Sequence, residues 1–184
     1  MEIKNKDCTI RRITAEDIVP ALDFIIPMLK EVYPNIPDVA VRWDLANMKE
    51  AYVIPDNSVM FAAFDGSRQV VGTVAIRPYD DRLEAVHGCY DVPVTAELSR
   101  CYVNNSLRRQ GIASILVAAI EEYCQQYGYQ TICLHTHRFL PSGFPFWIKQ
   151  GYIIRKEKPE KLETVYMDKL LTQQCSPIVE LTGS

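Results

Sequence analysis

The sequence lacks several features that would assign it to a broad class of protein at once. No apolar run approaches the ~18 residues of a membrane-spanning helix, and Met1–Arg12 is polar rather than signal-like. We therefore expect a cytoplasmic protein with no membrane partner. A basic excess is also missing, because 23 acidic residues outnumber 20 basic ones and the net charge is −3. Nucleic-acid-binding proteins present a basic face, so we expect no nucleic acid partner.

The cysteine and histidine patterns argue against two further kinds of site. Six cysteines are irregularly spaced and form no C-x-x-C pair, which favours reduced thiols over a disulfide framework. His135 and His137 share one face of a predicted strand, but zinc needs three or four ligands and no clustered partner is evident. We therefore expect no metal. A structural or substrate-lining role is the better interpretation of the two imidazoles.

Predicted strands and helices alternate along the 184 residues, a length typical of one α/β domain. Apolar alternation and turn residues predict strands at Thr9–Arg12, Ser58–Phe64, Gln69–Arg77, Thr95–Val103, Thr131–Thr136, Tyr152–Lys156 and Thr164–Leu170. Helical spacing predicts helices at Ile18–Val32, Asp38–Tyr52, Gly111–Tyr127 and Phe146–Gln150, with Asp38 as a cap of the second. Thr14 and Asp17 have capping-box spacing before the first helix.

The most informative segment is the short turn Arg108–Ala113, which joins a predicted strand to a long predicted helix. Free backbone N–H groups and the helix dipole meet at such a point, where a diphosphate can bind. Small residues at Gly111 and Ala113 keep the backbone accessible, and Arg108 and Arg109 add charge-assisted contacts. Taken alone, such a basic turn is more often a solvated surface than a binding site. Neither the Walker pattern nor G-x-G-x-x-G is present.

This turn resembles the signature [RQ]-x-x-G-x-[GA] of the GNAT superfamily of N-acetyltransferases. The resemblance extends, in the family's order, to Ile10–Asp17, Glu97–Asn104, Phe146–Tyr152 and Val165–Leu170. It implies a GNAT-like α/β (α+β) fold, with a mixed, mostly antiparallel sheet of about seven strands flanked by about four helices. The expected domain is residues 1–171, and residues 172–184 are a C-terminal tail.

The resemblance also implies a co-substrate, acetyl-CoA or another acyl-CoA, and a site for it. The main chain of Cys101, Tyr102 and Val103 would bind the pantetheine arm like an added strand. The backbone of the turn and the helix start would hold the pyrophosphate, with Arg108 nearby. The residues concerned are Arg108, Arg109, Gln110, Gly111, Ile112, Ala113 and Ser114.

The reaction implied by the family is direct attack of an amine on the thioester. Glu97 matches the position of the general base in many members, and the alternative is a surface carboxylate at a strand end. Trp147 stands where many members have a tyrosine that protonates the leaving thiolate, and indole cannot deliver a proton. Tyr102 is the candidate acid in its place, with Tyr152 or water as alternatives, unless the thiolate leaves unprotonated. The departure keeps a second function open, a catalytically weak or inactive acyl-CoA sensor module.

The acceptor is expected to be a small-molecule or peptide amine, contacted by Tyr90, His137 and Trp147. Carboxylates within Tyr79–Tyr90 could attract a cationic amine, or the segment could be a solvated loop. Cys101 could form an acyl-enzyme, although mid-strand cysteines are mostly buried and inert. Dimers are frequent in the family, so a homodimer is also expected.

Overall fold

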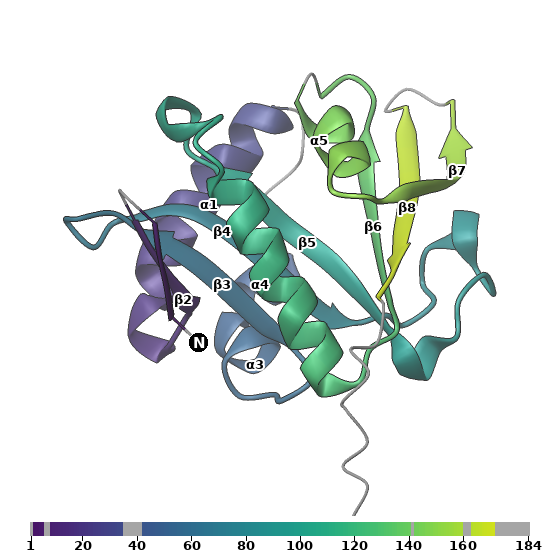
Figure 1. Ribbon diagram of the computed structural model, residues 1–184, viewed down its shortest axis with the longest axis horizontal. Helices are drawn as coiled ribbons and strands as arrows, with labels where there is room; N and C mark the ends of the chain where they lie inside the picture. The colour runs from purple at the N-terminus through teal and green to yellow at the C-terminus, as the bar shows by residue number, and fades with distance from the viewer. Residues whose placement is uncertain (1, 6–7, 35–41, 141, 160–162, 172–184) are drawn as a thin grey trace, which may run out of the picture.

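The computed structural model describes residues 2–5, 8–34, 42–140, 142–159 and 163–171. Within these ranges the backbone forms one eight-stranded sheet in the order β1-β2-β3-β4-β5-β6-β8-β7 (Figure 1). Every neighbouring pair is antiparallel except β5 and β6. The strands are β1 (Glu2–Asn5), β2 (Cys8–Arg12), β3 (Val59–Phe64), β4 (Val70–Pro78), β5 (Thr95–Val103), β6 (Thr131–His137), β7 (Ile153–Lys158) and β8 (Thr164–Leu170).

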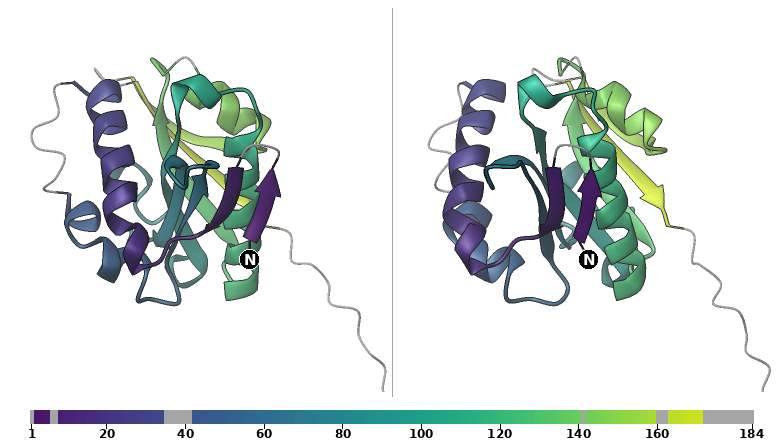
Figure 2. Two further views of the ribbon diagram at one scale, coloured as in Figure 1. Left: turned by 90° about the vertical axis from the view of Figure 1, so that its left-hand side faces the viewer. Right: turned by 60° about the vertical axis from the view of Figure 1, so that its left-hand side comes forward.

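Helices cover both faces of the sheet (Figure 2). One face carries α1 (Ile18–Val32), α2 (Trp43–Ala46) and α3 (Met48–Tyr52), and the other carries α4 (Ile112–Tyr127) and α5 (Gly143–Lys149). β3 is buried at every position because it lies between the two layers. No helix of the described ranges has both the length and the apolar character to cross a bilayer.

Each helical layer closes its own hydrophobic core. Beneath α4 and α5, the cluster includes Leu116, Ile120, Leu98 and Trp147, whereas Ile25, Leu29 and Met48 pack on the opposite face. Gly72 lets α4 approach β4 closely, because a Cβ there would lie 3.2 Å from Leu116 Cδ1. The two layers hold the central strands rigidly from both sides, which is what a precise binding site needs.

The fold class expected from the sequence is confirmed, and three details differ. β1 is a strand that the sequence does not predict, because the polar segment Glu2–Asn5 lacks apolar alternation. The second predicted helix is two short ones, α2 and α3, separated at Asn47, and its expected cap Asp38 lies outside the described residues. The predicted loop after β4 contains two 3₁₀ turns, Glu84–Val86 and Val92–Val94.

Candidate active site

The sheet divides where its one parallel pair ends. β5 and β6 pair only from Thr95–Glu97 to Thr131–Cys133, and they diverge beyond that point (Figure 1). A cavity of ≈ 620 Å³ begins at the division, lined by residues of β5 on one side and by His135 and His137 of β6 on the other. Its volume lies within the usual range for small-molecule sites.

A β-bulge shapes the β5 side of this cavity. Ala75 of β4 pairs with Ser99 but Thr73 pairs with Tyr102, so β5 holds one extra residue between the two pairs. Arg100 takes a left-handed backbone conformation there, with φ of 54°, and the Thr73 hydroxyl donates a hydrogen bond to its carbonyl at 2.8 Å. Bulges re-aim side chains, and here Ser99, Arg100 and Tyr102 all line the cavity.

The end of β5 and the start of α4 provide the features expected for an acyl-CoA site. Cys101–Val103 lie beyond the parallel pairing, so their backbone edge toward β6 is not part of that ladder. Gly111 precedes α4 with φ of 82°, a left-handed conformation that favours glycine. The first amides of a helix have no intrahelical acceptor, and within the described chain no side chain caps those of α4.

The sequence-predicted cofactor residues fall into three adjacent groups. Cys101, Tyr102 and Val103 end β5, and the turn that follows exposes Arg108, Arg109 and Gln110. Gly111 and the first turn of α4, Ile112, Ala113 and Ser114, complete the set. The side chain of Ile112 is buried in the core, so only its amide is available to a ligand. An extended arm could therefore run along β5 and place its phosphates at α4.

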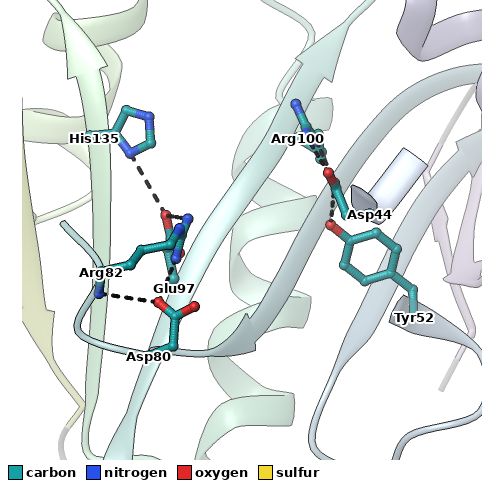
Figure 3. A network of polar contacts seen from close by, with 7 residues as sticks. All are labelled: Asp44, Tyr52, Asp80, Arg82, Glu97, Arg100 and His135. Atoms are coloured by element: carbon teal, nitrogen blue, oxygen red, sulfur yellow. Dashed lines mark hydrogen bonds and ion pairs between the residues drawn. The ribbon is translucent and has the colours of Figure 1, made fainter. Parts of the chain in front are cut away.

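Glu97 lies in the cavity wall as a paired carboxylate. Its side chain is 4% exposed, and Arg82 donates to both of its oxygens, at 2.5 and 2.9 Å (Figure 3). Asp80 binds the same guanidinium at 2.8 Å from the exposed side. His135 Nδ1 lies 3.7 Å from Glu97 Oε1, beyond hydrogen-bond distance but close enough to sense its charge. The His135 side chain is 40% exposed, and its partial desolvation among the cavity walls lowers its pKa, a shift that Glu97 opposes.

A second ion pair joins α2 to the bulge. Arg100 donates to both oxygens of Asp44 at 2.8 and 2.7 Å, and Tyr52 of α3 donates to Asp44 at 2.8 Å (Figure 3). Both charged side chains are less than a tenth exposed. Burial raises the pKa of Asp44, but Arg100 outweighs it, so the net shift is downward.

The cavity brings together three of the five predicted catalytic and substrate residues, Glu97, Tyr102 and His137. Two are elsewhere. The Tyr90 hydroxyl donates to Asp168 at 3.1 Å, and Trp147 packs in the α4 core against Phe146 and Tyr152. Neither residue lines the cavity. Of the acidic segment around Tyr90, only Arg82 and Leu83 line the cavity. Asp80 accepts from Arg82, and Asp81 contacts His87 and the Gly88 amide.

Sequence reasoning missed five charged residues at this site, which come from four separate elements or loops. No motif connects them, and only the fold brings them to one cavity. They are Arg42, Asp44, Arg77, Arg82 and Arg100.

Cys101 has the environment of a scaffold thiol. It packs partly against the core beneath α4, and burial raises its pKa to about 12. A nucleophilic cysteine needs a thiolate near neutral pH, which this environment disfavours. Among the residues that the structure describes, no three histidine, cysteine, aspartate or glutamate side chains gather as a metal site.

An open strand edge at the end of β5 and an uncapped helix start at α4 fit the co-substrate site that the sequence resemblance implies. The model of the acetyltransferase (GNAT) family matches residues 22–152. The chain therefore belongs to the GNAT acetyltransferase family.

Two human proteins are similar in sequence to this chain. N-acetyltransferase 8B is 28% identical and N-acetyltransferase 8 is 25% identical, each over 141 residues. The alignments cover 73% of this chain and 55% of each human protein. The chain thus spans about half the length of these curated relatives.

Solved structures share the fold at lower identity. A GNAT-family acetyltransferase from Staphylococcus aureus Mu50 superposes with a TM-score of 0.72 at 19% identity, covering 90% of this chain and 99% of that chain. The PaiA N-acetyltransferase from Thermoplasma acidophilum, solved in complex with coenzyme A, gives 0.65 at 18% identity, covering 88% and 97%.

Proposed function

We propose that this chain transfers an acetyl or other short acyl group from acyl-CoA to a primary amine on a small molecule or peptide. The observation that carries the proposal is the cavity at the division between β5 and β6, lined by Tyr102 of the same strand end that leads to the uncapped start of α4. The end of β5 and the start of α4 offer an open backbone edge and amides for the co-substrate, and the cavity offers room for an acceptor. A homodimer stays an expectation from the family resemblance.

The co-substrate would be held mainly by main-chain groups. Cys101–Val103 at the end of β5 would bind the pantetheine, and the amides from Arg109 to Ser114 would bind the pyrophosphate with Arg108 beside them. The exposed guanidinium groups of Arg108 and Arg109 add charge-assisted contacts. Acetyl-CoA, when bound, supplies the acyl group as an activated thioester.

The acceptor reacts as the neutral amine, and its nitrogen must lose one proton as it attacks the thioester. We propose that His135 takes this proton, because its imidazole lines the cavity and its lowered pKa keeps it neutral near pH 7. Glu97 was the base expected from the sequence, but both of its oxygens are bound by Arg82. Its negative charge, 3.7 Å from His135, would instead stabilise the imidazolium that forms.

In the transfer step the nitrogen–carbon bond forms, the carbon–sulfur bond breaks and the amine proton passes to His135. Tyr102 is the proposed acid for the departing thiolate. Burial raises the pKa of its hydroxyl, so the group keeps its proton at neutral pH. Tyr102 also lines the cavity, whereas Trp147 does not.

Release of free thiol tests the proposal. The chain is mixed with acetyl-CoA and a panel of small amines, amino acids and peptides, and calorimetry measures acetyl-CoA binding separately. We expect binding together with acceptor-dependent thiol release. Binding without release from any acceptor would leave only the sensor module, which the loss of the family's tyrosine at Trp147 favours. Absence of binding would overturn both functions.

A further inference from the structure

The charges around the cavity are unevenly balanced. Four arginines line it, against two carboxylates, so the lining has a net charge of +2 with its histidines neutral. The whole chain has a net charge of −3, so the positive sign belongs to the cavity and not to the surface in general. The arginines are Arg42, Arg77, Arg82 and Arg100, and the carboxylates are Asp44 and Glu97.

Two of the four guanidinium groups are already committed. Arg100 binds both oxygens of Asp44, and Arg82 binds both oxygens of Glu97. Each carboxylate thus has a two-point arginine partner. These pairs fix the wall of the cavity, and they leave the excess positive charge to the other two arginines.

Arg42 and Arg77 have no ion-pair partner among the described residues. Arg77 lies opposite Glu97 in the β4–β5 ladder, and its guanidinium stands 5.7 Å from the ring of Trp43, which is 57% exposed. Arg42 precedes α2, and its charge reaches Tyr33 and His135 across the cavity. Both cations therefore face the space that an acceptor would occupy.

We propose that the acceptor carries a carboxylate beside its reactive amine, and that Arg42 and Arg77 bind this carboxylate. The inference rests on the proposed acyl transfer and names its substrate class. Arginine suits the task, because its planar fork matches the two oxygens of a carboxylate. Purely cationic acceptors such as polyamines would meet a cavity of their own sign. Free amino acids and peptides with a terminal carboxylate share the required chemistry.

A set of matched acceptors tests the proposal by thiol release. Phenylalanine, phenylalaninamide and phenethylamine share one side chain and one amine, and only the first has a carboxylate. We expect kcat/KM for phenylalanine to exceed that for the other two by at least about tenfold, the effect of a hydrogen bond to a charged group. β-Alanine and a dipeptide then test which spacing between amine and carboxylate the site accepts. The dipeptide also shows whether the acceptor is a free amino acid or a peptide with a terminal carboxylate.

Substitutions connect the preference to the two residues. Arg42→Gln and Arg77→Gln should each lower the ratio of kcat/KM for phenylalanine over phenethylamine by about tenfold, mainly through KM. Arg42→Lys and Arg77→Lys, which keep the charge, should retain part of that ratio. Arg68→Gln is the matched control, because Arg68 lies in the exposed β3–β4 turn at the opposite end of β4 from Arg77. Two separate arginine sites keep the test informative if one variant fails to fold.

The outcomes separate this inference from the proposed function. If all three acceptors turn over equally, or phenethylamine is preferred, the carboxylate proposal is wrong and acyl transfer stands. A preference for phenylalanine that survives both glutamine variants would also overturn it. If acetyl-CoA binds and no amine releases thiol, the proposed function itself fails.

Discussion

Arg82 binds two carboxylates, Asp80 on its own loop and Glu97 on β5, and only the second faces the cavity. The guanidinium thereby fixes the position of Glu97 and partly neutralises it. His135 lies beside this pair without a hydrogen bond to it. Proton transfer at the site would consequently depend on the balance of charge around one imidazole.

The pH dependence of turnover should report that balance. Burial is the main cause that lowers the pKa of His135, so the acid limb of kcat/KM should lie below the usual imidazole value of about 6.5. Glu97 raises that pKa, and the groups that lower it are His137, Arg82 and Arg42. In Glu97→Gln the limb should move to lower pH, and in Arg42→Gln to higher pH. Using one acceptor throughout keeps the acceptor's own pKa out of the comparison.

The same Glu97→Gln variant should lose turnover while it keeps acetyl-CoA. We expect kcat to fall on the order of tenfold or more, because the imidazolium loses its anion. The dissociation constant for acetyl-CoA should change little, since the site proposed for it comprises residues of Cys101–Ser114 and not Glu97. Asp80→Asn is the control, because Asp80 touches Arg82 from outside the cavity. A lower kcat without movement of the acid limb would indicate a purely structural role for Glu97.

At the scale of elements, the short helices α2 and α3 are attached to the bulge of β5 by the Asp44 network. Arg100 and Tyr52 both bind Asp44, and all three side chains are largely buried. A buried cation that loses its partner cannot recover its hydration, so such pairs are costly to break. The network therefore connects the cavity wall to the helical layer above it.

Asp44→Ala should destabilise the protein by about 3–5 kcal/mol, because Arg100 is left buried and unpaired. Chemical denaturation measures this difference as a shift of the unfolding midpoint at unchanged slope. Tyr52→Phe removes only one hydrogen bond to the carboxylate and should cost about 1–3 kcal/mol. Equal effects of the two variants would show that the ion pair contributes nothing beyond that hydrogen bond.

The connection from β2 to α1 should weaken in acid. Asp17 accepts hydrogen bonds from Arg11 and from the Thr14 backbone, which confirms the predicted capping-box spacing, and its pKa is lowered to about 2, mainly by Arg11. A depressed carboxyl pKa stabilises the fold above the unfolded value of about 3.9, and the contribution is lost as pH falls from there toward 2. Asp17→Asn should thus lower the melting temperature at pH 7 and have little effect at pH 2.

At the scale of the whole molecule, β1–β5 and β6–β8–β7 are two parts of one sheet that pair directly over three residues of each strand. A ligand lying along Cys101–Val103 would add contacts at this division. Acetyl-CoA at a hundred times its dissociation constant should therefore stabilise the fold by about 2.7 kcal/mol. Hydrogen exchange should slow at Cys101–Val103 and at Gly111–Ser114. Protection confined to other segments would contradict the site assignment.

Local patterns made much of this molecule predictable. The α4 segment has strong helical spacing and ends at Gly128, and β5 was predicted with its observed bounds. The turn before α4 was predicted as well, since its glycine and arginines are adjacent in sequence. What escaped prediction depends on distant residues meeting. Arg100 binds Asp44, which lies 56 positions away in the sequence, and no local pattern predicts that contact. The β-bulge at Arg100, which allows this ion pair, is likewise not predicted by any local pattern.

The extra residue in β5 gives neighbouring side chains the same direction. Side chains of a regular strand alternate between faces, so one residue separates two that share a face. Here Leu98 and Cys101 both pack in the α4 core, and two residues, Ser99 and Arg100, lie between them and line the cavity. Arg100 is thus a supernumerary position in an otherwise alternating strand. A chain from which it was deleted would keep every other residue of β5 on its present face, and the cavity would lose the cation that binds Asp44.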